Sequence, residues 1–413
     1  MKMKVGRVIS VVDIGSTKIS CCIANITGDK RFDILGVGYC ACFGVKHGVI
    51  VDIDLVSKSI ARAVENAEKT ANFRIKSVYV NVSGKFVRSE LINSVINIGG
   101  RIVRYEDVER LICQSIKKNP REEVIHSVPV LFEMDSMICA TDPVGMFSNI
   151  LKTSVNVVSI PKIQLNNIVL SLSRCHLDVI RVIYSGYAAG LCALEGDSNQ
   201  DDQIVIDFGG GVTTVNFFYK KKFCGLEVVP LGGKNITRDI ACGLNVSSLN
   251  AERLKTLHGA AFESFDDKKN MILVPIQEEN DVIDLQQMAR SDLNKIIQPR
   301  VEEILKLIKE KIDNSVFKSD FAKNFIITGG GSMLTGMREF IIEKFKKPTK
   351  MKKMEDFSET FGIQIGNDFS TTIGMIQFAL LSDGVTLNHQ NDLSQDTDGG
   401  IFKKTMNWLE NNL

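Results

Sequence analysis

The sequence predicts an α/β protein whose core is duplicated into two lobes. Two segments far apart in the chain, 8–26 and 202–219, share one pattern: an apolar strand ends in Asp, an apolar residue and Gly, and a turn rich in hydroxyl groups leads into a second strand. Such an internal repeat is typical of duplicated units that face each other. A third apolar strand, 324–328, ends in the glycine-rich run 329–332. Strands of both expected lobes therefore end in glycine-rich turns.

Apolar periodicity predicts most of the remaining elements. Short β-branched runs predict strands over 77–82 and 179–185. Apolar residues at helical spacing predict helices over residues 55–72, 161–175, 285–311 and 372–381. The segment 84–161 has a different pattern of apolar residues, because short alternating runs flank a single helical stretch, 105–117. We expect this segment to form a compact α+β insertion.

Length and charge limit the classes of protein to consider. The chain has 413 residues, enough for two or three domain-sized units, and a formal net charge of +1. We expect no nucleic-acid partner, because no bulk positive field attracts one. The ten cysteines and five histidines show no metal-ligand spacing, so no zinc site is expected. Asp13 interrupts the first apolar run, which excludes a signal peptide, and no stretch is long enough for a transmembrane helix.

The glycine-rich turns predict a site for a polyphosphate. Glycine lets backbone N–H groups approach a phosphate, hydroxyl groups add donors, and a lysine adds positive charge. Asp13 and Asp207 each end a strand, so they are candidates to hold Mg²⁺ through water. The candidate phosphate-binding residues are Gly15, Ser16, Thr17 and Lys18 in the first turn and Gly209, Gly210, Gly211 and Thr213 in the second.

Three alternative interpretations of these glycine-rich turns fit the sequence less well. Any one of the turns alone could be an ordinary tight turn, but the duplicated Asp-turn argues against that reading for the set. The chain has no GxxxxGK[ST] motif, which excludes a P-loop. The glycines of 208–213 precede a strand and not a helix, which is a poor fit to a Rossmann turn.

These motifs carry a family resemblance. The turns at 13–18 and 207–213 resemble the two phosphate motifs of the superfamily of actin, heat-shock chaperones and sugar kinases, and Ile326–Ser332 resembles its adenosine motif. Residues 183–190 and 371–377 resemble its two connecting helices. Within the superfamily, the segments VVPLGGKNITRDIACGL, AERLKTLHGAA and LQQMARSDLNKIIQPRVEEIL are similar to those of the FtsA family of bacterial division proteins. The last segment carries Gln298 where many members carry Glu.

The resemblance implies an actin-like (ribonuclease H-like) two-lobed α/β fold with an inserted α+β subdomain, called 1C, and a C-terminal amphipathic tail. The implied division, by residue number, is 1–84 and 162–195 for the first lobe (1A), 85–161 for 1C, 196–381 for the second lobe (2A/2B), 382–400 for a flexible linker and 401–413 for the tail helix.

The resemblance also implies ATP and Mg²⁺ as ligands. The FtsA-like segments add Gly232 and Gly233 to the expected site, and Glu252 and Lys255 as contacts to the ribose or base. The adenosine motif adds Gly329, Gly330, Gly331 and Ser332. No residue that would activate water can be identified, so we expect at most slow ATP hydrolysis. A solvated helix face remains the alternative for Glu252 and Lys255.

The C-terminal segment 401–413 predicts an amphipathic helix that follows a flexible, polar linker. An apolar face with an aromatic anchor and a lysine-bearing polar side suits a membrane interface. The residues expected at the membrane are Ile401, Phe402, Lys403, Lys404, Met406, Trp408, Leu409 and Leu413. A helix that docks back on the protein, or a disordered tail, is the alternative.

The resemblance implies a role as an adaptor in cell division. It places the protein on the cytoplasmic face of the inner membrane at the division site, where it would polymerise head-to-tail and bind the C-terminal peptide of FtsZ on the second lobe. Arg300 is the candidate peptide contact. A PilM-like pilus-assembly adaptor, a chaperone ATPase and a small-molecule kinase of the same superfamily are the alternatives.

Overall fold

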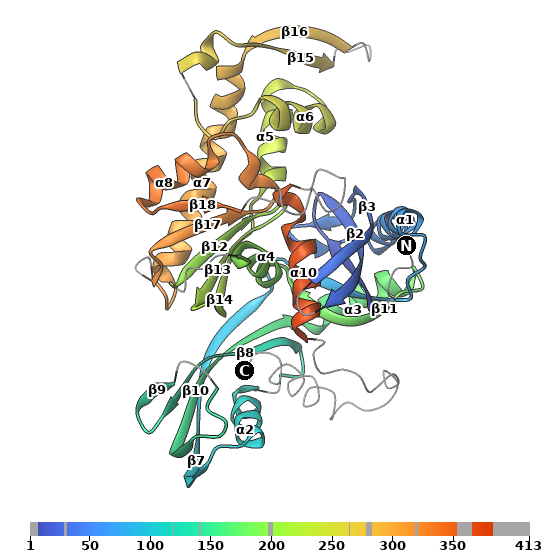
Figure 1. The fold of residues 1–413 in the computed structure, drawn as a ribbon. Coiled ribbons are helices and arrows are strands. Elements are labelled where there is room, and N and C mark those ends of the chain that lie inside the picture. The colour runs from blue at the N-terminus through green and yellow to red at the C-terminus, as the bar shows by residue number, and fades with distance from the viewer. Residues whose placement is uncertain are drawn as a thin grey trace.

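The computed structural model describes residues 7–28, 31–117, 119–139, 142–196, 201–263, 265–277, 283–318, 321–352 and 366–382. The chain forms two lobes, each built on a five-stranded sheet, with two helices between them and a third unit that projects from one end (Figure 1). No helix within these ranges is both long and apolar enough to cross a bilayer.

The sheet of the first lobe has the order β11-β6-β1-β2-β3. Its strands are β1 (Arg7–Ile14), β2 (Lys18–Gly28), β3 (Arg31–Ala41), β6 (Ser77–Val82) and β11 (Asp178–Tyr184). The helices α1 (Ile53–Ala71) and α3 (Lys162–Ser173) pack against each other and against strands of this lobe. The side chain of Asp52 accepts a hydrogen bond from Leu55 N and so caps α1, whose buried face includes Val56, Ile60 and Ala63.

The sheet of the second lobe repeats this topology with the order β14-β13-β12-β17-β18. Its strands are β12 (Gln203–Phe208), β13 (Thr213–Tyr219), β14 (Lys222–Val229), β17 (Asn324–Thr328) and β18 (Thr349–Met351). In both sheets a central antiparallel hairpin has a third antiparallel strand on one side and a parallel strand on the other. The duplication predicted from the sequence is thereby confirmed.

The second lobe also carries α5 (Gly233–Leu244), α6 (Ser248–His258), α7 (Arg290–Asn314), α8 (Met337–Phe345) and the hairpin of β15 (Met271–Gln277) with β16 (Ile283–Ala289). The predicted helix over 285–311 was wrong in its first five residues, which belong to β16. These residues form cross-strand pairs with β15, and on that strand Ile272 and Val274 are buried. A short segment with apolar residues close together fits either period, so partner pairing decided the outcome.

The projecting unit is the expected α+β insertion. Its sheet has the order β7-β10-β8-β9, made of β7 (Arg88–Ile102), β8 (Glu122–Met134), β9 (Met137–Cys139) and β10 (Phe147–Pro161). The helix α2 (Tyr105–Ser115) buries Val108, Leu111 and Ile112. His126 ties the insertion to the first lobe, because Tyr184 N donates a hydrogen bond to its Nε2 at 2.9 Å.

Two helices, α4 (Ser185–Leu194) and α10 (Ser370–Ser382), lie between the lobes (Figure 1). They approach so closely that a Cβ added at Gly374 would lie 1.8 Å from Ala188 O. Each helix begins at the level of the glycine-rich turns, since Ser185 and Ser370 both line the same cavity as those turns. The close contact between α4 and α10 therefore lies where the two lobes meet.

Candidate nucleotide site

A cavity of about 460 Å³ lies between the two lobes. It is lined by all three glycine-rich turns and by the first residues of α4 and α10. The predicted site residues found in its wall are Asp13, Gly15, Ser16, Thr17, Lys18, Asp207, Gly209, Gly210, Gly211, Gly233, Glu252, Lys255, Gly329, Gly330 and Gly331. Residues that are far apart in the sequence therefore meet around one space.

The two Asp-turns have the same backbone shape. A Cβ added at Gly15 would lie 2.8 Å from Lys18 O, and one added at Gly209 would lie 2.7 Å from Val212 O. Each contact is between a residue and the carbonyl group three positions later in its own turn. A side chain at either glycine would therefore force the turn open, which explains why both turns need glycine at this position.

The two turns also touch each other across the cavity. A Cβ added at Gly210 would lie 2.3 Å from Thr17 Cγ2, and one added at Gly211 would lie 2.3 Å from Ser16 Oγ. The Ser16 hydroxyl group is held in place by Gly48 N, which donates to it at 3.1 Å. Glycine at 210 and 211 is thus needed for the lobes to approach this closely.

Asp13 is buried within a network of polar side chains from three elements. Its Oδ1 accepts from Asn81 Nδ2 at 2.6 Å, and its Oδ2 accepts from Thr372 Oγ1 at 3.2 Å. Asn81 also donates to Ser185 Oγ at 3.0 Å, which joins β6 to the start of α4. Burial raises the pKa of Asp13 to about 6, although Lys18 and the hydrogen bond from Thr372 act in the opposite direction.

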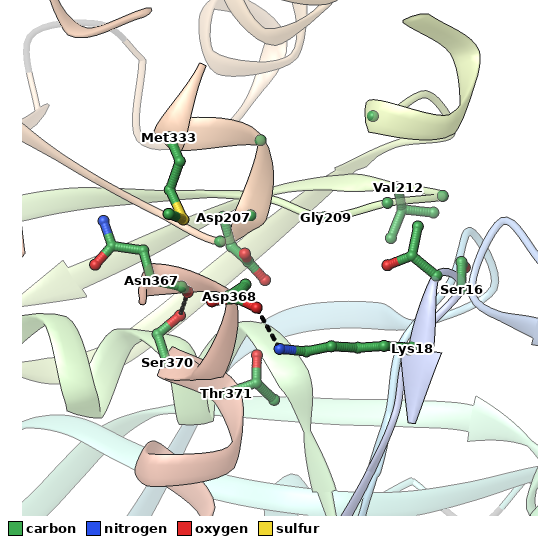
Figure 2. A pocket seen from close by; sticks show the side chains of 18 of the residues that line it. Ser16, Lys18, Asp207, Gly209, Val212, Met333, Asn367, Asp368, Ser370 and Thr371 are labelled. Atoms are coloured by element: carbon green, nitrogen blue, oxygen red, sulfur yellow. Dashed lines mark hydrogen bonds and ion pairs between the residues drawn. The ribbon is translucent and has the colours of Figure 1, made fainter. Parts of the chain in front are cut away.

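Asp207 occupies the equivalent position in the second hairpin but has different surroundings. Its side chain is buried and faces the cavity (Figure 2), and no side-chain or backbone donor among the described residues contacts its carboxylate. Burial raises the pKa of Asp207 to about 7, and the nearby Asp13 acts in the same direction. A buried carboxylate without a donor is costly unless a cation neutralises it.

The donor set fits Mg²⁺ held together with a polyphosphate. The described residues contain no group of three or more His, Cys, Asp or Glu side chains that could hold a metal ion alone. Mg²⁺ typically takes only one or two carboxylates and completes its shell with water and phosphate oxygens. The unpartnered Asp207 carboxylate, with Asp13 opposite, matches that requirement.

Lys18 extends from the first turn toward the segment before α10. Its Nζ lies 2.5 Å from Asp368 Oδ2 (Figure 2). The same Nζ lies 3.3 Å from the centre of the Phe369 ring. Burial lowers the pKa of Lys18, while the adjacent Asp368 carboxylate acts to raise it. The lysine predicted to meet a phosphate is therefore paired with a carboxylate of this chain.

Glu252 and Lys255 line the cavity. Both project from α6, and Lys255 Nζ donates to Glu252 Oε2 at 2.7 Å and to Thr237 Oγ1 at 2.9 Å. Lys255 also reaches Gly233 O at 3.3 Å, next to the second glycine-rich turn. These contacts tie α6 to α5 at the wall of the cavity.

Three predicted residues do not line the cavity. The Thr213 hydroxyl donates to Leu231 O at 2.9 Å, and Thr214 is the neighbour that lines the wall. Gly232 lies behind the second turn, with an added Cβ 2.4 Å from Gly209 O. The Ser332 hydroxyl donates back to Gly329 O at 2.7 Å and shapes the third turn from outside.

The cavity also contains polar residues that sequence reasoning missed. They are Asn81, Ser83, Ser185, Thr214, Thr256, Thr335, Asn367, Asp368, Ser370 and Thr371. Ser185 and Thr371 lie in the segments identified as connecting helices, so their position at the cavity could have been inferred from that motif. Asn81 lies near the end of β6, the strand that pairs with β1, whereas Asp368 lies outside every motif.

Two further expectations concern Arg300 and the C-terminal segment. Arg300 on α7 forms a two-pronged ion pair with Asp239 of α5, at 2.6 Å and 3.1 Å, and also contacts Glu303. The guanidinium group thus links α5 to α7. The expected linker and membrane-binding helix, 382–400 and 401–413, lie outside the described residues except for Ser382, which ends α10.

Two sheets of equal topology, joined by crossed helices around a cavity with facing glycine-rich hairpins, define an actin-like protein. Solved structures of this fold are similar over most of the chain. The PilM-PilN type IV pilus biogenesis complex gives a TM-score of 0.62 at 15% identity, covering 90% of this chain and 98% of that chain. MreB5 of Spiroplasma citri bound to ADP gives 0.56 at 9% identity, covering 90% and 96%.

Sequence comparison identifies the family. The family model described as cell division protein FtsA matches residues 204–374, and the model of the SHS2 domain inserted in FtsA matches 84–159. Cell division protein FtsA of Rhizobium meliloti is 32% identical over 392 residues, which cover 92% of this chain and 89% of that protein. FtsA of Escherichia coli K12 is 26% identical and covers 96% of each. The chain belongs to the FtsA family of cell division proteins.

Proposed function

We propose that the chain is an adaptor of cell division that binds Mg-ATP between its lobes and uses the nucleotide to control its own assembly. The single observation that carries the proposal is the contact between the two glycine-rich turns beside a cavity lined by Asp207, whose carboxylate has no donor in the part of the chain that the structure describes. The structure of MreB5 with bound ADP, which shares the fold, supports a nucleotide as the ligand.

Each side of the cavity would hold one part of the ligand. The backbone N–H groups of both glycine-rich turns, with Ser16, Thr17 and Lys18, would bind the phosphates. Gly329–Gly331 and the pair Glu252 and Lys255 would line the nucleoside. Bound Mg²⁺ would neutralise phosphate charge and supply the cation that the Asp207 carboxylate requires.

Nucleotide binding is tested by calorimetric titration of the full chain with ATP, with and without Mg²⁺. We expect saturable binding that requires the metal and that weakens strongly in Asp207→Ala. Adenosine alone should bind much more weakly, because it lacks the groups that the two turns hold. Failure of wild-type protein to bind Mg-ATP at millimolar concentration would overturn this part of the proposal.

We propose that the closed lobes assemble head-to-tail into filaments, since a repeated contact between unlike faces produces an open polymer. Family membership supports FtsZ as the partner, bound through its C-terminal peptide on the second lobe. Light scattering with Mg-ATP tests the assembly, and capture of an immobilised FtsZ tail peptide tests the partner. An Asp207→Ala protein that assembles normally would contradict nucleotide control.

Arg300 needs a matched control, because it already pairs with Asp239. If Arg300 contacts the peptide, Arg300→Ala should abolish capture, while Asp239→Asn should retain it or strengthen it by freeing the guanidinium group. If both variants lose capture equally, the ion pair only maintains the packing of α5 on α7, and the contact lies elsewhere.

For the segment 401–413 we propose attachment to the cytoplasmic face of the membrane at the division site. The amphipathic sequence supports this, and several tails on one filament would bind more firmly than a single tail. Co-sedimentation with vesicles of anionic and neutral phospholipid should pellet the full chain with ATP but not a chain that stops at Leu381. Equal pelleting of both chains would contradict the proposal.

The expected division of the chain is retained as part of this proposal, with 85–161 as subdomain 1C between two parts of the first lobe and 196–381 as the second lobe. The position of the α+β insertion supports these boundaries. The PilM-like alternative shares the fold, but 15% identity supports the fold alone. A pull-down with FtsZ distinguishes the two adaptors, and a coupled assay with common sugars tests the kinase alternative.

A further inference from the structure

The ion pair between Lys18 and Asp368 lies in the wall of the cavity. Lys18 begins β2 of the first lobe. Asp368 lies against the third glycine-rich turn of the second lobe, where its Cβ lies 3.4 Å from the position of a Cβ added at Gly330. The neighbouring Asn367 donates to Ser332 Oγ at 3.4 Å. Asp368 therefore lies next to the third glycine-rich turn, and its carboxylate meets Lys18 at the cavity.

The contact is larger than a single ion pair. Lys18 Nζ also lies over the ring of Phe369, at 3.3 Å from its centre, and Tyr39 of β3 packs edge-on against the same ring at 5.9 Å. Three residues further on, the Thr372 hydroxyl shares a hydrogen bond with Ser20 Oγ at 2.8 Å. The segment 366–372, which leads into α10, is thus held by β2 and β3 of the first lobe.

This arrangement places a carboxylate where a phosphate would have to compete for the same ammonium group. Lys18 has 21% of its side chain exposed and Asp368 has 37%, so the pair is partly shielded but still reached by solvent. A polyphosphate that binds in the cavity must break this ion pair, and it is also repelled by the negative charge of Asp368. Both effects lower its affinity.

We propose that Asp368 is an internal competitor of the nucleotide phosphates: it holds Lys18 in the free protein, and a bound polyphosphate displaces it. The proposal rests on the proposed nucleotide function of the same cavity. Displacement frees the start of α10, the helix that leads toward the C-terminal segment. The loss of the contact between Lys18 and Asp368 would thus be the first local change on binding.

The test compares wild type, Asp368→Asn, Lys18→Ala and the double variant by calorimetric titration with Mg-ATP. Asp368→Asn keeps the size of the side chain and removes its charge. We expect Mg-ATP to bind this variant about fivefold more tightly than wild type, as the loss of a partly exposed competing pair allows. In the Lys18→Ala background the same substitution should change affinity much less, because the competition acts through Lys18.

A second pair of measurements separates competition from a merely structural role. Adenosine, which lacks phosphates, should bind Asp368→Asn and wild type equally. Without ligand, Asp368→Asn should melt at a lower temperature than wild type, because the ion pair with Lys18 is lost. Asp292→Asn, which removes an exposed ion pair with Lys295 on α7, serves as the control and should leave Mg-ATP affinity unchanged.

The outcomes distinguish this inference from the function on which it rests. If wild type does not bind Mg-ATP, the proposed function fails. If wild type binds and Asp368→Asn binds equally or more weakly, Asp368 is not a competitor, and weaker binding would make it a ligand contact instead. If Asp368→Asn strengthens adenosine binding to the same degree, the effect is not directed at phosphate and the inference fails.

Discussion

The hairpins β1–β2 and β12–β13 share a topology and a backbone shape, yet their leading carboxylates differ in surroundings. Asp13 accepts hydrogen bonds from Asn81 and Thr372, whereas no donor among the described residues contacts Asp207. Burial raises the pKa of Asp13 to about 6 and that of Asp207 to about 7. A duplicated motif can thus keep its geometry while only one copy depends on a ligand to satisfy its charge.

The largest expected effect comes from disturbing the backbone of the second turn. In Gly232→Ala the new Cβ would lie 2.4 Å from Gly209 O, whereas in Gly233→Ala the nearest atom is Lys255 Nζ at 3.5 Å. We expect Gly232→Ala to lower the free energy of unfolding by about 1–3 kcal/mol and to weaken Mg-ATP binding more than tenfold. Chemical denaturation and titration of both variants measure this, and equal losses in the two would show that the close approach to Gly209 O is not their cause.

The carboxylates should respond differently to neutralisation. Without ligand at pH 8, Asp207→Asn should stabilise the protein by about 2 kcal/mol, because it removes a buried charge that has no hydrogen-bond donor among the described residues. Asp13→Asn should change stability by less, since its hydrogen-bonded neighbours already support the side chain. Denaturation curves of both variants provide the measurement. A destabilised Asp207→Asn would mean that Asp207 has a stabilising partner in the free protein.

The same carboxylates predict the pH dependence of stability. Their pKa values are raised in the folded protein, so the folded state binds more protons than the unfolded state between about pH 4 and 7. Stability relative to an Asp13→Asn, Asp207→Asn double variant should therefore fall as pH rises through this window. Melting temperatures of both proteins at pH 5.5 and pH 8 test this. Saturating Mg-ATP should reduce the difference, because the bound cation favours the ionised carboxylates.

The smallest expected effect concerns the adjacent threonines of the second turn. Thr213 donates to Leu231 O, whereas Thr214 lines the cavity. Thr213→Val should therefore cost about 1 kcal/mol of stability and leave Mg-ATP affinity within about twofold. Thr214→Val should weaken binding more than it changes stability. Paired melting and titration experiments decide between the two hydroxyl groups, and a reversed pattern would place Thr213 at the ligand.

The pattern of residues in the chain was enough to locate most of the cavity wall. Glycine followed by hydroxyl groups after an apolar strand is a local signal, because only certain backbone shapes bring N–H groups toward a phosphate. Thr214 lines the cavity and Thr213 does not, because successive strand residues face opposite sides and the phase of β13 is set by its pairing with β12. The start of α7 was misplaced for a related reason, since β15 captured residues 285–289 as a strand.

The sequence by itself determined the duplicated α/β core, the three turns and the identity of Asp13 and Asp207 as their leading carboxylates, because these depend on short-range pattern and steric limits. Only the tertiary structure decided that Asn81 satisfies Asp13, that Asp207 has no donor among the described residues and that Asp368 pairs with Lys18. Lys18 and Asp368 are separated by 350 positions in the chain. Their meeting depends on how α10 packs against β1 and β2, and no local pattern in the sequence specifies that packing.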